Sequence, residues 1–165
     1  MVKPRTLPTF RVHYLTYKSK LITSSPFIAN TNVTTGNLTV TTISDPITLV
    51  EQKELAINVT VQSISGTTPT LDVYLDVLDP IESQNKNVSS GENNPVVSVK
   101  LDPTQITTTP VNLRAIIANG QLVVWEGNTA TNLGAFNVPM KWQVRFVIGG
   151  TSPSYGIIAT YEARQ

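Results

Sequence analysis

The sequence predicts an all-β fold, an antiparallel β-sandwich or jelly roll of about eight or nine strands with an extended N-terminal arm. Apolar and polar residues alternate along most of the chain, which is typical of strands with one face in a core. Turn residues interrupt these stretches about every 8–15 residues, a spacing typical of sandwiches. The 165 residues amount to one domain, with 40% hydrophobic residues and a net charge of only +1, which argues against disorder.

The N-terminal segment differs from the rest of the chain in charge. Its first 44 residues contain five basic side chains and no acidic one, whereas residues 45–165 contain seven basic and eleven acidic side chains. Stretches rich in turn residues occur at 3–8 and 23–26. We therefore assign residues 1–36 to a basic arm and residues 37–165 to the sandwich body.

The clearest strand covers residues 71–78, where apolar residues alternate with Asp72, Tyr74 and Asp76. Residues 55–61 repeat this pattern. Because residues 65–69 have a turn composition, the two runs are predicted to pair as an antiparallel hairpin. Both aspartates are expected to be charges that face solvent.

Further alternating runs predict the remaining strands. They lie at 38–40, 97–101, 142–148 and 155–161, the last two separated by a turn at 149–153. Asp-Pro pairs at 45–46, 79–80 and 102–103 are expected at strand ends, because proline cannot donate to a ladder. The longest loop is predicted at residues 79–95.

Residues 109–120 are compatible with two structures. A helix would have Thr109 as its N-cap, Pro110 as its first residue and Gly120 just past its end. Two strands joined by Asn119-Gly120 would form a hairpin. We favour the hairpin, because β-branched residues flank the turn.

The composition excludes several kinds of site. The chain has no cysteine and one histidine, so disulfides, Cys/His zinc sites and cysteine nucleophiles are excluded. We interpret His13 as an exposed histidine on a strand of the arm. Asp72 and Asp76 are about 13 Å apart along a strand, too far for a glycosidase pair. We expect no enzymatic activity and no cofactor.

A calcium site and a membrane location are not expected either. Five residues of one region offer oxygen ligands, but without EF-hand spacing: Asp76, Asp79, Glu82, Asn85 and Asn87. No apolar run approaches the roughly 18 residues of a membrane span. The N-terminus lacks the apolar region of a secretory signal.

The arm is the first candidate binding element. Electrostatic attachment is assigned to its cations, Lys3, Arg5, Arg11, Lys18 and Lys20, and packing to Phe10, Val12 and Tyr14. Nucleic acid is not the expected partner, since no three cations cluster. We favour contact with another protein; the alternative is that the segment is the first strand of the sandwich plus a disordered end.

Tyr74 and Trp125 form the second candidate surface. In the hairpin interpretation Trp125 points away from the core, and we expect it beside Tyr74. Such a tryptophan closes the end of a core or lies in an oligomer interface. The alternative is that it stacks on a sugar ring.

Residues 71–80 and 138–150 resemble small β-sandwich virion proteins of tailed bacteriophages and related viruses. The shared pattern is a strand ending in Asp-Pro, a Leu-Arg strand and a Pro-x-x-Trp strand, present here as Leu113-Arg114 and Pro139-Met-Lys-Trp142. The resemblance covers about residues 37–163. The sequence differs from the family in its N-terminal arm and in its longer loop at 79–95.

The resemblance implies a capsid decoration (cementing) protein. Such a protein binds the major capsid protein lattice on the outside of a virus head as a homo-oligomer, by analogy a trimer, and is located in the virion. The alternative is a carbohydrate-binding or adhesin module of a tail, spike or cell surface.

Overall fold

The computed structural model describes residues 27–80 and 95–165, and these residues form nine strands and no helix. The all-β, antiparallel class is therefore confirmed. Consequently, no described segment is a helix that could cross a membrane. The strands are β1 (Phe27–Leu38), β2 (Thr42–Ile43), β3 (Ile47–Thr48), β4 (Glu54–Val77), β5 (Val97–Lys100), β6 (Asn112–Ala118), β7 (Gln121–Glu126), β8 (Thr129–Ala135) and β9 (Lys141–Arg164).

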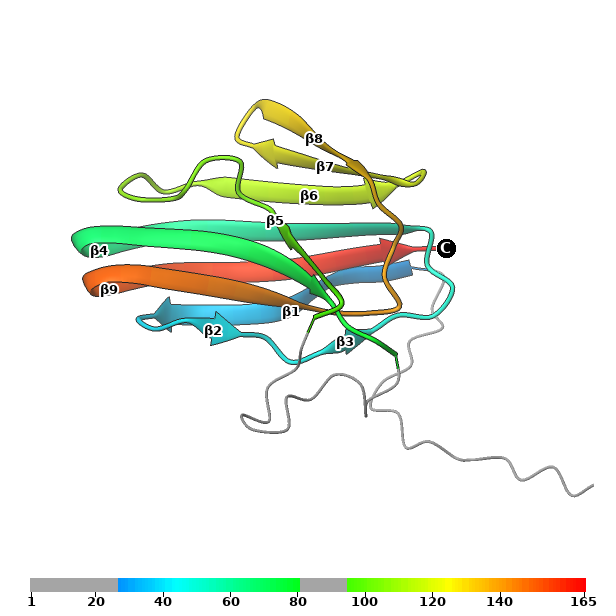
Figure 1. Ribbon diagram of the computed structural model, residues 1–165, viewed down its shortest axis with the longest axis horizontal. Coiled ribbons are helices and arrows are strands. Elements are labelled where there is room, and N and C mark those ends of the chain that lie inside the picture. Colours follow the sequence, from blue (N-terminus) through cyan, green and yellow to red (C-terminus); the bar gives the residue numbers. More distant parts are fainter. Residues whose placement is uncertain (1–26, 81–94) are drawn as a thin grey trace, which may run out of the picture.

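Two strands of 24 residues each, β4 and β9, organise the fold. They pair antiparallel along their whole length, from Glu54 opposite Arg164 to Val77 opposite Trp142. Both strands fold back on themselves, at residues 65–69 in β4 and 149–154 in β9 (Figure 1). The pair is thus one bent two-stranded ribbon that belongs to both layers of a sandwich.

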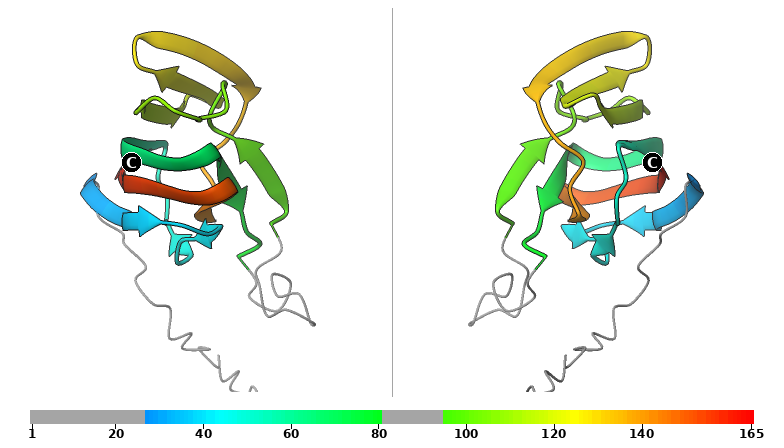
Figure 2. Two further views of the ribbon diagram at one scale, coloured as in Figure 1. Left: turned by 90° about the vertical axis from the view of Figure 1, so that its left-hand side faces the viewer. Right: turned by 90° about the vertical axis from the view of Figure 1, so that its right-hand side faces the viewer.

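The other strands extend each half of this ribbon. In layer A, residues 54–65 of β4 and 154–164 of β9 are flanked by β1 on one side and by β6, β7 and β8 on the other. In layer B, the other halves of β4 and β9 are flanked by β5 on one side and by β2 and β3 on the other. In the left view of Figure 2 the bends face the viewer, and β1 (blue) and β5 (green) lie on opposite sides, in different layers.

The core lies between the two layers. Alternate residues of the ribbon point inward and are buried, as the sequence alternation predicts. The indole of Trp142 in layer B meets the ring of Tyr161 in layer A edge-on, with ring centroids 5.3 Å apart. This contact joins the layers at the end opposite the bend.

Two glycines allow the ribbon to bend tightly. Gly66 and Gly150 have φ values of 119° and 105°. A Cβ on Gly66 would lie 2.7 Å from the carbonyl oxygen of Ser152, and one on Gly150 would lie 2.5 Å from that of Thr68. The two bends therefore pack backbone against backbone, and only glycine fits at either position.

The predicted hairpin between residues 55–61 and 71–77 is wrong. Those runs belong to one strand, β4, and each pairs with β9 rather than with the other. The turn composition at 65–69 marks a real change of direction, but this change takes the chain from one layer to the other.

The hairpin at Asn119-Gly120 is confirmed, and the helix alternative is wrong. Ala118 lies opposite Gln121, and the two turn residues have φ values of 52° and 73°, as a two-residue hairpin turn requires. The three Asp-Pro pairs follow β2, β4 and β5 as predicted.

The first described strand begins inside the segment assigned to the arm. Residues 27–36 pair with β9 at the edge of layer A, so they belong to the sheet. Residues 1–26 lie outside the described part of the chain, as do residues 81–94 of the predicted long loop.

Candidate binding surfaces

The predicted arm residues belong to the N-terminal segment that precedes β1. All eight lie outside the described residues: Lys3, Arg5, Phe10, Arg11, Val12, Tyr14, Lys18 and Lys20. The same holds for His13 and for Glu82, Asn85 and Asn87 of the candidate calcium site. Within the described residues, no three acidic or histidine side chains gather in a way that could hold a metal ion.

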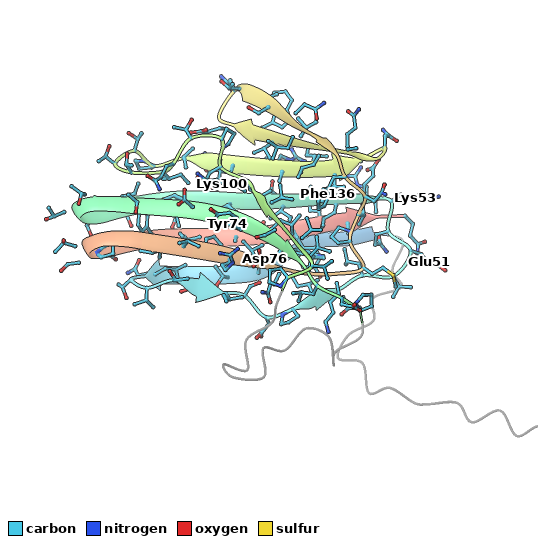
Figure 3. All side chains as sticks on the ribbon, in the orientation of Figure 1. Glu51, Lys53, Tyr74, Asp76, Lys100 and Phe136 are labelled. Atoms are coloured by element: carbon cyan, nitrogen blue, oxygen red, sulfur yellow. The ribbon has the colours of Figure 1, made fainter. Side chains whose placement is uncertain are left out.

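Tyr74 lies on the outer face of layer B, between Lys100 of β5 and Arg145 of β9. Figure 3 labels Tyr74 with Lys100 and Asp76 of the same face. The guanidinium carbon of Arg145 lies 4.5 Å from the centroid of the tyrosine ring. This cation–π contact covers one face of the ring. Tyr74 is therefore already engaged by a residue of its own chain.

Asp76 contradicts the prediction of a solvent-facing charge, because it is only 1% exposed. Arg145 holds it with two hydrogen bonds, from Nε to Oδ2 at 2.7 Å and from Nη2 to Oδ1 at 3.0 Å. Ser98 donates to Asp76 Oδ1 and accepts from Arg145 Nη2 at 2.8 Å. The aspartate does point outward, as the alternation predicts, but side chains of β5 and β9 bury it.

A second group of polar side chains continues this network along β5. Lys100 Nζ lies 2.7 Å from Asp72 Oδ1 and 3.3 Å from Asp102 Oδ2. Gln105 donates to Asp72 at 3.0 Å, and the backbone N–H of Val73 donates to Asp102 at 2.7 Å. These contacts fasten β5 and the segment after it to β4.

The two aspartates bound by Lys100 differ in acidity. Burial raises the pKa of Asp102 to about 6, although the Val73 N–H and the charge of Lys100 act in the opposite direction. For Asp72, burial acts in the same direction, but hydrogen bonds from Lys100 and Gln105 outweigh it and lower the pKa. Hydrogen bonding to Asp72 is the main cause that raises the pKa of Lys100.

We expect the protein to be more stable at pH 5 than at pH 7.5. A raised pKa in the folded state means that protonation of Asp102 favours folding, so this stabilisation is lost as the pH rises through 6. The gain at pH 5 is about 1 kcal/mol in the free energy of unfolding. The opposite effect of Asp72 is confined to pH below about 4.

Thermal unfolding of the wild type and of Asp102→Asn at both pH values measures this effect. The difference between pH 5 and 7.5 should shrink in the variant, while contributions from other groups, including His13, cancel in the comparison. An identical difference in both proteins would contradict the role of Asp102.

The network was missed by sequence reasoning. Its members come from three strands and from the segment after β5, and the alternation of the strands assigns their members only to an outer face. These side chains bind each other: Arg145 forms an ion pair with Asp76, and Lys100 lies between the carboxylates of Asp72 and Asp102. The sequence does hold one signal, because Ser98 and Lys100 of β5 alternate with apolar residues just as Asp72, Tyr74 and Asp76 do.

Trp125 lies on the outer face of layer A and is 40% exposed. Since Tyr74 is on the outer face of layer B, the two predicted aromatic residues lie on opposite sides of the sandwich. The neighbour of Trp125 on β6 is instead Arg114, directly opposite in register. The sequence predicts an outward Trp125 correctly, but not its companion.

A shallow groove of about 170 Å³ lies on the same face, and Arg114 is one of the residues that line it. Ala56 and Ile116 supply its apolar surface, and Glu54, Arg114, Glu162 and Arg164 its charged rim. The groove exists because Ala56 is the smallest outward side chain in its part of β4.

The sheet edges carry features that hinder the addition of another strand. The pairing of β1 with β9 is irregular at two places, and that of β8 with β7 at one. At the β8 irregularity, Asn132 Oδ1 accepts a hydrogen bond of 2.8 Å from the N–H of Gly134. Such irregularities protect edges, so we expect no partner strand to be added at β1 or β8.

Comparison with known proteins gives no family. No family model matches the chain, and no curated protein matches it. A fructosyltransferase from A. japonicus aligns with a TM-score of 0.44 and 10% identity over 83% of this chain and 26% of its own. An alginate lyase of polysaccharide lyase family 7 aligns with a TM-score of 0.38 and 9% identity, over 68% of this chain and 60% of its own. This chain thus spans only part of either protein.

Proposed function

We propose that the protein is a structural, non-catalytic component of a virus particle. It binds the major capsid protein lattice on the outside of the head as a homo-oligomer, and its N-terminal arm holds the neighbouring copy. The resemblance of residues 37–163 to small virion β-sandwich proteins is one support for this proposal.

The observation that carries the proposal is the place from which the arm departs. Residues 1–26 precede β1, which is an edge strand of layer A, and β1 begins opposite Arg164 near the end of β9. A segment that precedes an edge strand can bind another molecule without disrupting the core of its own subunit. The irregular pairing of β1 with β9 and of β8 with β7 disfavours strand addition at these two edges, and we assign self-association to the arm.

Charge supports the same assignment. The arm contributes five cations, while the described residues contain nine acidic and six basic side chains. A positive arm and a negative body attract each other between copies, and this attraction weakens as salt screens it. Closure of a ring of copies on a lattice then multiplies modest contacts.

Reversing the arm charges should weaken self-association at least tenfold. In the test variant Lys3, Arg5, Arg11, Lys18 and Lys20 become glutamate, and in the matched control each lysine and arginine of this set is exchanged for the other, which keeps the charge. Sedimentation velocity should show oligomers for the wild type and the control, and association at least tenfold weaker for the reversed variant, with an unchanged β circular-dichroism spectrum. A monomeric wild type, or a reversed variant that associates normally, would refute the role of the arm.

A further inference from the structure

The outer face of layer A holds an exposed aromatic ring beside a cationic side chain that has no partner among residues 27–80 and 95–165. Trp125 and Arg114 are cross-strand neighbours on β7 and β6, so their side chains rise from the sheet about 5 Å apart. We propose that this face binds a saccharide that carries a carboxylate, with the sugar ring on Trp125 and the carboxylate on Arg114. The proposal is independent of the capsid role.

Arg114 is free to take a ligand. No described residue forms an ion pair or hydrogen bond with its side chain, although Glu54 and Glu162 line the same groove. A guanidinium binds a carboxylate through two parallel hydrogen bonds, which gives both strength and orientation. A carboxylated sugar would supply the carboxylate partner that the described part of the chain does not.

The surface around the pair suits a flat ligand. The outward residues next to Arg114 along its row of the sheet are Asn58 and Thr160, both short and polar. Because they are short, the indole of Trp125 projects above them from the sheet. Both can form hydrogen bonds with hydroxyl groups of a ligand. Aromatic side chains combine a large apolar face with such polar surroundings at binding sites.

The opposite face of the sandwich lacks this combination. There the aromatic ring is Tyr74, which Arg145 already covers, and the guanidinium of Arg145 is held by Asp76 and Ser98. Layer A therefore presents a ring and a cation that are both available, whereas layer B presents a pair that is already occupied.

A polyanion such as nucleic acid fits this face less well than a saccharide. The described residues carry more acidic than basic side chains, and the groove rim holds two glutamates next to two arginines. Nucleic acid requires several cations for its phosphates. A carboxylated saccharide fits better. Its carboxylate would bind Arg114, and its hydroxyl groups would form hydrogen bonds with Glu54, Glu162 and the amide of Asn58.

The test is a titration of the full chain with oligosaccharides of galacturonate, mannuronate and hyaluronan, with sialyllactose, and with neutral cellohexaose and maltohexaose. Trp125 fluorescence reports stacking, because the other tryptophan, Trp142, is fully buried. Calorimetry gives the affinity. We expect at least one carboxylated sugar to bind at least tenfold more tightly than both neutral ones and to change the fluorescence.

Two variants locate the site. Trp125→Ala and Arg114→Gln should each weaken binding at least tenfold, and Arg114→Lys should restore only part of it. Met140→Ala, an exposed apolar residue outside layer A, is the matched control and should bind normally. Equal binding of neutral and carboxylated sugars, binding of single-stranded DNA in place of sugar, or no binding at millimolar concentration by a folded wild type would overturn the proposal.

Discussion

Replacing Arg145 with alanine is expected to lower the free energy of unfolding by about 3–5 kcal/mol, because it leaves a buried carboxylate without its counter-charge. Asp76 is 1% exposed and takes both hydrogen bonds of the guanidinium fork. The variant also loses the contact between Arg145 and Tyr74. Chemical denaturation measures the change, and Arg145→Lys should recover only part of the loss, since an ammonium cannot form the fork.

Arg114→Ala is the matched control for this experiment. Arg114 also projects outward from a strand, but it is exposed and has no ion pair among the described residues. Its removal should change the free energy of unfolding by no more than about 0.5 kcal/mol. If the two arginine variants lose similar stability, the buried ion pair is not the source of the effect.

Gly150→Ala is expected to lower the free energy of unfolding by about 3 kcal/mol or more. Two costs combine: a non-glycine residue at φ 105°, and a Cβ placed 2.5 Å from the carbonyl oxygen of Thr68. The obstacle is backbone of the neighbouring bend, which cannot move aside as a flexible side chain could. Thermal and chemical unfolding, with circular dichroism to verify the fold, measure the loss.

Gly134 separates these two costs. It has nearly the same φ, 103°, but a Cβ there would meet no atom within 4 Å. Gly134→Ala should therefore show the conformational cost alone, about 1–3 kcal/mol. The close approach of the two bends would be refuted by equal losses in the two variants.

Local patterns in the sequence predict the strands well but not how they pair. Alternation identifies the buried face of β4 and β9, and Asn119-Gly120 identifies the β6–β7 hairpin, because both signals depend on residues near each other in the chain. The pairing of β4 with β9 depends on residues far apart. Residues 65–69 have the composition of a hairpin turn, yet the strand segments on either side of this bend pair with β9 and not with each other.

The candidate sites show the same division. Alternation predicts that Asp76 and Trp125 face outward, and both do. Whether an outward residue is exposed depends on the strand beside it: Arg145 buries Asp76, whereas the position next to Trp125 holds Arg114, which leaves the indole accessible. A single sequence does not specify these neighbours, because they follow from pairings between distant segments.

The bent ribbon also sets an order for how the molecule can form. The central strand pair of each layer forms only when β9 pairs with β4, and β5 to β8 lie between these two strands in the chain. In a nascent or refolding polypeptide the apolar face of β4 therefore stays exposed until β9 has been synthesised and has paired with it. Pairing of segments so far apart in the sequence is slow, so we expect refolding over milliseconds to seconds. The yield of refolded protein should depend on conditions that prevent aggregation of the unpaired chain.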